Sequence, residues 1–91
     1  MPTIRLPSKF DFSQHKTFTE QYENVLAEDS KVPIQLDFSA VEYLDSAALG
    51  MMVLLRKKAV VKNREVQMKN VRGTAYELLS MANFQKLFKI N

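Results

Sequence analysis

The apolar residues of this chain switch repeatedly between a period of two and a period of three to four, and this alternation constrains the fold most. Strand-like and helix-like segments follow one another in the order 3–7, 13–29, 32–41, 46–63, 65–71 and 75–83. Alternation of this kind is typical of α/β domains, in which helices pack on a sheet and crossovers are right-handed. Because the strands are short and carry Gln, Lys and Asp, we expect one sheet face to be incompletely covered.

Each of the first two helical segments has an apolar face that can be assigned to the core. In the first, Ser13 is a reasonable N-cap, and one face carries Phe18, Tyr22, Val25 and Leu26. In the second, a stripe without charge marks the core face, formed by Ala48, Met52, Leu55 and Ala59. Residues 84–90 fit a short strand and a helical turn equally well.

A second apolar surface is expected on the helix at 46–63. Ala47, Met51 and Leu54 point roughly away from its core stripe. A helix whose first turns are apolar nearly all round must cover something on more than one side. Part of this surface is therefore predicted to be a partner site.

The composition excludes several classes of protein. The chain has no cysteine and only one histidine, His15. These counts exclude any zinc site or hydrolase site that requires a second imidazole. No apolar run reaches the length of a membrane span, and the N-terminus lacks the apolar region of a secretory signal. We expect the 91 residues to form a single domain, 1–91, in the cytoplasm.

A basic cluster follows the apolar part of the second helix. Five of the 13 Lys and Arg residues fall within nine positions, namely Arg56, Lys57, Lys58, Lys62 and Arg64. Such clusters bind phosphates, but cations at the C-terminal end of a helix also complement its dipole. Because no aromatic residues are interleaved with these cations, we do not expect direct binding of nucleic acid.

Carboxylates at strand and helix ends are the other candidate ligands. Asp11, Asp37 and Asp45 would form a metal site only if the fold gathers them, and solvated acids are commoner at such positions. Asp45 and Ser46 are not a catalytic pair by themselves, because neighbours on a strand-to-helix turn usually point in different directions. Motifs of phosphate loops, dinucleotide-binding turns, zinc proteases and nucleophile elbows are absent.

The stretch LDSAALG, residues 44–50, places an acid and a serine where a strand meets a helix. Either Ser46 is the N-cap, or Asp45 is the N-cap and Ser46 is the first helical residue with an accessible hydroxyl. Both place the Ser46 oxygen near free N–H groups and the positive end of the helix dipole. A phosphate there would be tolerated by the domain and would disrupt a partner docked on this turn. The residues alone favour a plain cap over a switch.

Along nearly its whole length, from Ile4 to Ile90, the chain resembles the STAS domain of sulfate transporter tails and bacterial anti-sigma factor antagonists. Residues 34–59, IQLDFSAVEYLDSAALGMMVLLRKKA, resemble the family signature, and 8–12 and 66–90 resemble its flanks. The resemblance implies an α/β fold with a mixed sheet of about four strands and helices packed mainly on one face. Family members usually begin with one more strand than the first seven residues can supply.

The resemblance also implies a mechanism. In the antagonist subfamily, the phosphorylated serine corresponds to Ser46. The unphosphorylated protein binds an anti-sigma factor, often a serine kinase as well, and thereby frees the sigma factor. Phosphorylation weakens binding, and a PP2C-type phosphatase restores it. Since the partners perform the phosphoryl chemistry, this chain is expected to be a monomeric or weakly dimeric switch, not an enzyme, with no cofactor and no membrane contact.

The expected contact surface surrounds Ser46, with apolar residues in its buried part and charges on its rim. It comprises Lys9, Asp11, Asp45, Ser46, Ala47, Gly50, Met51 and Leu54. The chain departs from the family pattern at Ser8, which replaces a glycine, and at Ala47 and Ala48, which replace Ser and Gly. Small free-standing STAS proteins also serve as subunits of transport ATPases, including lipid transporters, so that role is the alternative.

Overall fold

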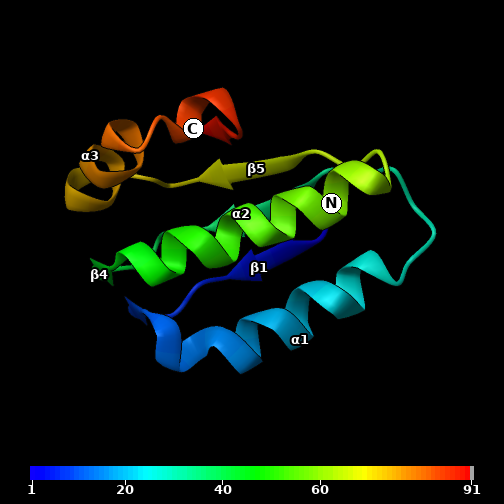
Figure 1. Ribbon diagram of the computed structural model, residues 1–91, viewed down its shortest axis with the longest axis horizontal. Coiled ribbons are helices and arrows are strands. Elements are labelled where there is room, and N and C mark those ends of the chain that lie inside the picture. The colour runs from blue at the N-terminus through cyan, green and yellow to red at the C-terminus, as the bar shows by residue number, and fades with distance from the viewer. Residues whose placement is uncertain (91) are drawn as a thin grey trace.

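Four short parallel strands form the central sheet of the computed structural model, which describes residues 1–90 (Figure 1). Their spatial order is β1 (Thr3–Arg5), β3 (Ile34–Asp37), β5 (Val66–Lys69) and β6 (Lys89–Ile90). The expected number of strands is confirmed, but all three neighbouring pairs are parallel, so the sheet is not mixed. The reason is that a helical crossover joins each pair and returns the chain to the same end of the sheet.

The helices are α1 (His15–Leu26), α2 (Ser46–Val61) and α3 (Gly73–Met81). The first two lie side by side over the sheet, and α3 lies near the end of the sheet where α2 begins (Figure 1). A second, two-stranded parallel sheet joins β2 (Lys9–Phe10) to β4 (Tyr43–Leu44). None of the helices within residues 1–90 has the length and hydrophobicity that crossing a bilayer requires.

The core lies between the sheet and the first two helices. The predicted α2 stripe of Ala48, Met52, Leu55 and Ala59 is fully buried. On the sheet, the alternation also holds, because Ile4, Leu36 and Met68 are adjacent in register and buried. The strand residues that alternate with these three are polar, so the opposite face of the sheet is polar. This agrees with the expectation, based on the polar residues in the strands, that one sheet face is incompletely covered.

Two expectations about local structure are corrected, and one open choice is resolved. Ser13 is not the N-cap of α1, because Asp11 caps a 3-10 turn at Phe12–Gln14 by accepting a hydrogen bond from the Ser13 amide at 3.0 Å. Met51 does not point outward: it follows Ala48 by three positions and precedes Leu55 by four, which places it on the core face. The C-terminal tail contains both a 3-10 turn, Phe84–Lys86, and strand β6.

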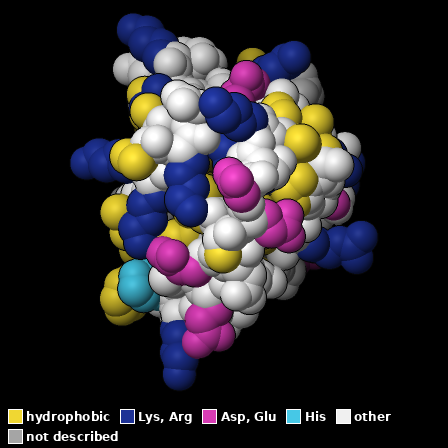
Figure 2. All heavy atoms as spheres, turned by 90° about the vertical axis from the view of Figure 1, so that its right-hand side faces the viewer, with side chains coloured by type: hydrophobic (Ala, Val, Ile, Leu, Met, Phe, Trp, Pro, Cys, Tyr) yellow, Lys and Arg dark blue, Asp and Glu magenta, His cyan; other side chains and the backbone are white. Residues whose placement is uncertain are grey.

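Most of the predicted basic cluster holds the fold together. The buried Arg64 guanidinium donates hydrogen bonds to the carbonyl oxygens of Val25, at 2.8 Å, and Val32, at 3.0 Å. Lys62 donates to the carbonyl of Leu26, so both cations meet the C-terminal end of α1, where the helix dipole is negative. Lys58 pairs with Glu23 of α1 at 2.6 Å. These cations therefore tie α2 and the loop that follows it to α1, at the end of the molecule that Figure 2 faces, where Lys and Arg side chains lie among Asp and Glu side chains.

Candidate functional site

The turn that begins α2 resolves the choice between the two possible caps. Asp45 has an extended backbone, and its carboxylate accepts a hydrogen bond from the Ala48 amide at 2.9 Å. Asp45 is therefore the N-cap, and Ser46 is the first residue of the helix. Ser46 is exposed, so its hydroxyl is free of a capping role and open to a partner or a modifying enzyme.

Replacing Asp45 with alanine is expected to lower the free energy of unfolding by about 1 kcal/mol, because it removes the side-chain acceptor of the cap. The measurement is urea denaturation of the purified domain. Asp45→Asn keeps an acceptor at the same place and should stay close to the original stability. Equal losses in the two variants would show that the Asp45 charge matters rather than the cap.

The small β2–β4 sheet brings the first residues of the predicted contact surface to this turn. Lys9 pairs in register with Tyr43, and Leu44, next in β4, directly precedes Asp45. The Lys9 ammonium lies 3.8 Å from a carboxylate oxygen of Asp11, so the exposed Lys9 and the half-buried Asp11 form an ion pair. A hydrogen bond from the Ser13 hydroxyl lowers the pKa of Asp11 below its usual value. Through the pairing of β2 with β4, both charges lie beside the strand that leads into the Ser46 turn, and their part in partner binding stays a prediction.

The outward face of α2 carries three of the predicted contact residues. Ser46, Gly50 and Leu54 follow one another at intervals of four, and all three are exposed, whereas Ala47 is half-buried. Met51 retains only 6% of its accessible surface, so it can contribute little direct contact. A Cβ atom at Gly50 would meet no atom within 4 Å. The helix thus presents a shallow surface where a partner can approach its backbone closely.

Sequence reasoning missed two exposed aromatic residues beside these positions. Phe12, in the 3-10 turn, is 65% exposed and stacks on His15 with ring centroids 5.2 Å apart. Tyr43, paired with Lys9, is 51% exposed. Spacing carried no signal for this exposure, because Phe10 and Phe12, two residues apart, would face the same side of a continued strand, and the 3-10 turn that begins at Phe12 separates them. Exposed aromatic residues of this kind commonly anchor protein interfaces.

A buried acid organises the loops at the same end of the sheet. Asp37, at the end of β3, accepts hydrogen bonds from the Asn70 amide group at 3.0 Å and the Ser39 N–H at 2.9 Å. These bonds, the one from Asn70 first, lower the pKa of Asp37 below its usual value. Asp37 thus fixes the loop after β5 to the loop that leads into β4. Within residues 1–90, the acids predicted as conditional metal ligands do not gather into a metal-binding group.

The lowered pKa of Asp37 predicts an acid-dependent loss of stability. Because the folded protein holds this carboxylate ionised more strongly than the unfolded chain, the stabilisation is complete above the unfolded pKa and falls as the pH decreases. Between about pH 5 and pH 3, the free energy of unfolding should drop more steeply for the wild-type domain than for Asp37→Asn. Urea denaturation across this range measures both slopes, and parallel slopes would contradict the assignment.

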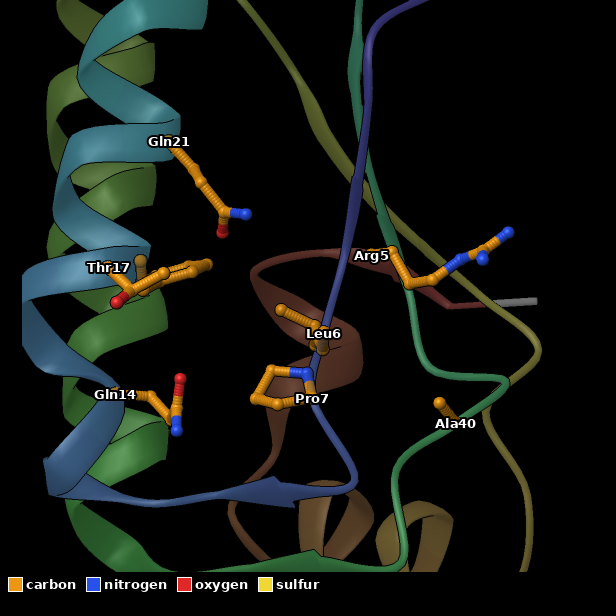
Figure 3. A pocket seen from close by; sticks show the side chains of 8 residues that line it. Arg5, Leu6, Pro7, Gln14, Thr17, Gln21 and Ala40 are labelled. Atoms are coloured by element: carbon orange, nitrogen blue, oxygen red, sulfur yellow. The ribbon is translucent and has the colours of Figure 1, made fainter.

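A separate groove of about 330 Å³ lies between β1 and α1, away from the first turn of α2 (Figure 3). Gln14, Thr17 and Gln21 of the helix side line one wall, and Leu6 and Pro7 line the other. Arg5 is the only charged residue of the lining, and Figure 3 shows its side chain directed away from α1. This lining holds no acid–base pair or nucleophile–base pair.

The chain is similar to known proteins over nearly its whole length. Residues 1–89 match the family model described as "Mlab, STAS domain". The chain belongs to the STAS domain family. A STAS-domain containing protein of Pseudomonas aeruginosa (strain UCBPP-PA14) is 36% identical over 89 residues, which cover 98% of this chain and 86% of that protein. The resemblance seen in the sequence is therefore confirmed.

Solved STAS-like structures have the same fold. The crystal structure of a candidate anti-sigma factor antagonist of Thermotoga maritima, TM1081, matches with a TM-score of 0.80 at 20% identity, covering 97% of this chain and 77% of that one. A sulfate transporter family protein of Wolinella succinogenes matches with a TM-score of 0.82 at 14% identity, covering 98% and 74%. At these identities, the matches establish the architecture.

Proposed function

We propose that this STAS domain is an anti-sigma factor antagonist whose binding is controlled at Ser46. It binds an anti-sigma factor while Ser46 is unphosphorylated and is released when Ser46 is phosphorylated, which controls sigma-factor-dependent transcription in the cytoplasm. The observation that carries the proposal is the exposed Ser46 hydroxyl at the first position of α2, with the capping role taken by Asp45.

The geometry supports a switch in binding rather than in fold. A phosphate on Ser46 would lie at the positive end of the α2 dipole, where anions are tolerated. The same phosphate would lie about one turn from Gly50 and two turns from Leu54, the exposed positions of α2 that a partner would cover. A partner covering that surface would have to desolvate a charge of about −2. The modification therefore weakens the complex and leaves the domain folded.

The proposed partners supply the chemistry. An anti-sigma factor with serine kinase activity would phosphorylate Ser46, and a PP2C-type phosphatase would remove the phosphate. Lys9 and Asp11 would contribute the charged rim, and the exposed Phe12 and Tyr43 would add aromatic anchors that extend the contact surface beyond the predicted set.

The test is affinity purification of the tagged chain from cells of its source organism, with mass spectrometry identifying both the co-purified proteins and the state of Ser46. We expect an anti-sigma factor in the eluate and a singly phosphorylated fraction of the chain that lacks this partner. Recovery of the anti-sigma factor with the phosphorylated chain would contradict the proposal.

A second candidate function is that of a STAS subunit of a transport ATPase of the lipid transporter type. It is supported by the half-buried Ala47, which places an apolar side chain directly beside Ser46 and suits constitutive packing against a partner. The likeness to a sulfate transporter family protein also associates this fold with transport. The same purification separates the two candidates, because this one predicts a co-purified ATPase and no phosphate on Ser46.

A further inference from the structure

A small groove lies beside the Ser46 turn, between β4 and the start of α3. Its volume is about 180 Å³, and it is lined by Val41, Glu42, Tyr43, Leu44, Thr74, Ala75 and Leu78. Figure 1 places β4, the start of α2 and α3 at one end of the molecule, on the left of the view. Because Leu44 directly precedes Asp45 and Ser46, the groove continues the proposed contact surface.

Helix α3 is poorly packed for so apolar a segment. Leu79 is its only buried residue, whereas Ala75 and Leu78 are half-buried where they line the groove. A helix whose apolar residues are left uncovered in this way has surface available for a partner. The α3 side of the groove is therefore a partly exposed apolar surface formed by Ala75 and Leu78.

The charges around the groove specify what can occupy it. Glu42 is the only charged residue of the lining, and it is exposed. The nearby cation Lys9 is paired with Asp11, and Arg72 donates to the Ser39 carbonyl at 3.4 Å, so both have other contacts. The groove therefore combines an apolar interior with an uncompensated carboxylate at its rim.

We propose that this groove binds one aliphatic or aromatic side chain of the partner that docks on α2, together with an adjacent Lys or Arg that pairs with Glu42. This inference rests on the proposed function, since it extends the same contact surface. A second copy of this chain does not suit the site, because two such grooves would bring their Glu42 carboxylates together. Ser46 is not part of the groove lining. A phosphate on Ser46 would weaken binding at the α2 part of the contact surface, because the partner would have to desolvate it.

Two blocked dipeptides, N-acetyl-Leu-Arg-amide and N-acetyl-Leu-Glu-amide, test the groove without the partner. NMR titration of the labelled domain should show saturable shifts at Leu44, Ala75 and Leu78 with the Leu-Arg peptide and at least about fivefold weaker binding of Leu-Glu. Glu42→Gln, a change at an exposed position, should remove most of this difference. Absence of saturable shifts at these residues, or equal binding of the two peptides to the wild-type domain, would overturn the proposal.

The partner obtained by affinity purification provides the second test. Ala75→Trp fills the groove and should reduce partner retention at least about tenfold, whereas Met81→Trp, exposed on the same helix outside the lining, should not. Glu42→Lys provides a variant on the rim that does not alter packing and should also reduce retention. If Ser46→Asp releases the partner while Ala75→Trp and Glu42→Lys retain it, the groove proposal fails and the proposed function stands. If Leu-Arg binds as expected but Ser46→Asp has no effect, the proposed function fails alone.

Discussion

Replacing Ser46 with aspartate is expected to weaken binding of the anti-sigma factor by at least about tenfold, or about 1.4 kcal/mol. The same change should leave the midpoint of thermal unfolding nearly unchanged. The reason for the first effect is that a partner covering Gly50 and Leu54 must desolvate the added carboxylate. The reason for the second is that Ser46 is exposed, makes no capping bond, and occupies the end of α2 that favours anions.

Isothermal titration calorimetry with the purified partner measures the affinity, and differential scanning calorimetry of the domain alone measures the midpoint. Ser46→Ala is the matched control, because it removes the hydroxyl without adding charge and should bind nearly as tightly as the wild type. Tight binding by Ser46→Asp would refute control at this residue. A large fall in the midpoint would instead mean that the aspartate disturbs the fold.

Replacing Gly50 with glutamine should have opposite effects on stability and binding. A Cβ atom at Gly50 meets nothing within 4 Å, so the domain can accommodate the side chain. Because glycine is a poor helix former, the free energy of unfolding should rise by about 0.5 kcal/mol. The longer side chain would prevent close approach to the α2 backbone, and the partner affinity should fall by at least about tenfold.

The same two calorimetric measurements suffice for Gly50→Gln. Lys57→Gln places the same side chain at an exposed position of α2 outside the predicted contact set, and it should leave affinity nearly unchanged at low and moderate salt. Unaltered affinity in Gly50→Gln, together with raised stability, would remove α2 from the contact surface. The partner would then have to be sought on other elements.

The sequence predicted the features that depend on local periodicity. The α2 stripe of Ala48, Met52, Leu55 and Ala59 is buried, and the alternation in β3 and β5 holds because each strand has one face against helices. The Ser46 turn was also foreseen, although only the structure chose between the two caps. Pattern alone left this choice open, because Asp and Ser are both good N-caps.

The structural features that the sequence pattern did not predict depend on contacts between distant segments of the chain. Met51 was assigned to the outer face, but the buried arc of α2 is wide enough to include it because α1 and the sheet both border this helix. From the sequence, the basic cluster is explained by its position at the C-terminal end of a helix. In the structure, Arg64 donates hydrogen bonds to the carbonyls of Val25 and Val32, which lie far away in the sequence. The exposure of Tyr43 likewise follows from the pairing of β2 with β4, and that of Phe12 from the 3-10 turn after β2.

The agreement between strand order and chain order has a consequence for folding. Each strand of the order β1-β3-β5-β6 pairs with the strand that precedes it in the main sheet, so every pairing closes a loop of one helical crossover and none spans the whole chain. Each pairing joins residues 22 to 32 positions apart, so it has to wait for its own crossover, which slows folding, but for no later segment of the chain. The sheet can therefore grow in the direction of synthesis, and the turn that carries Ser46 can form before the last strand has been made.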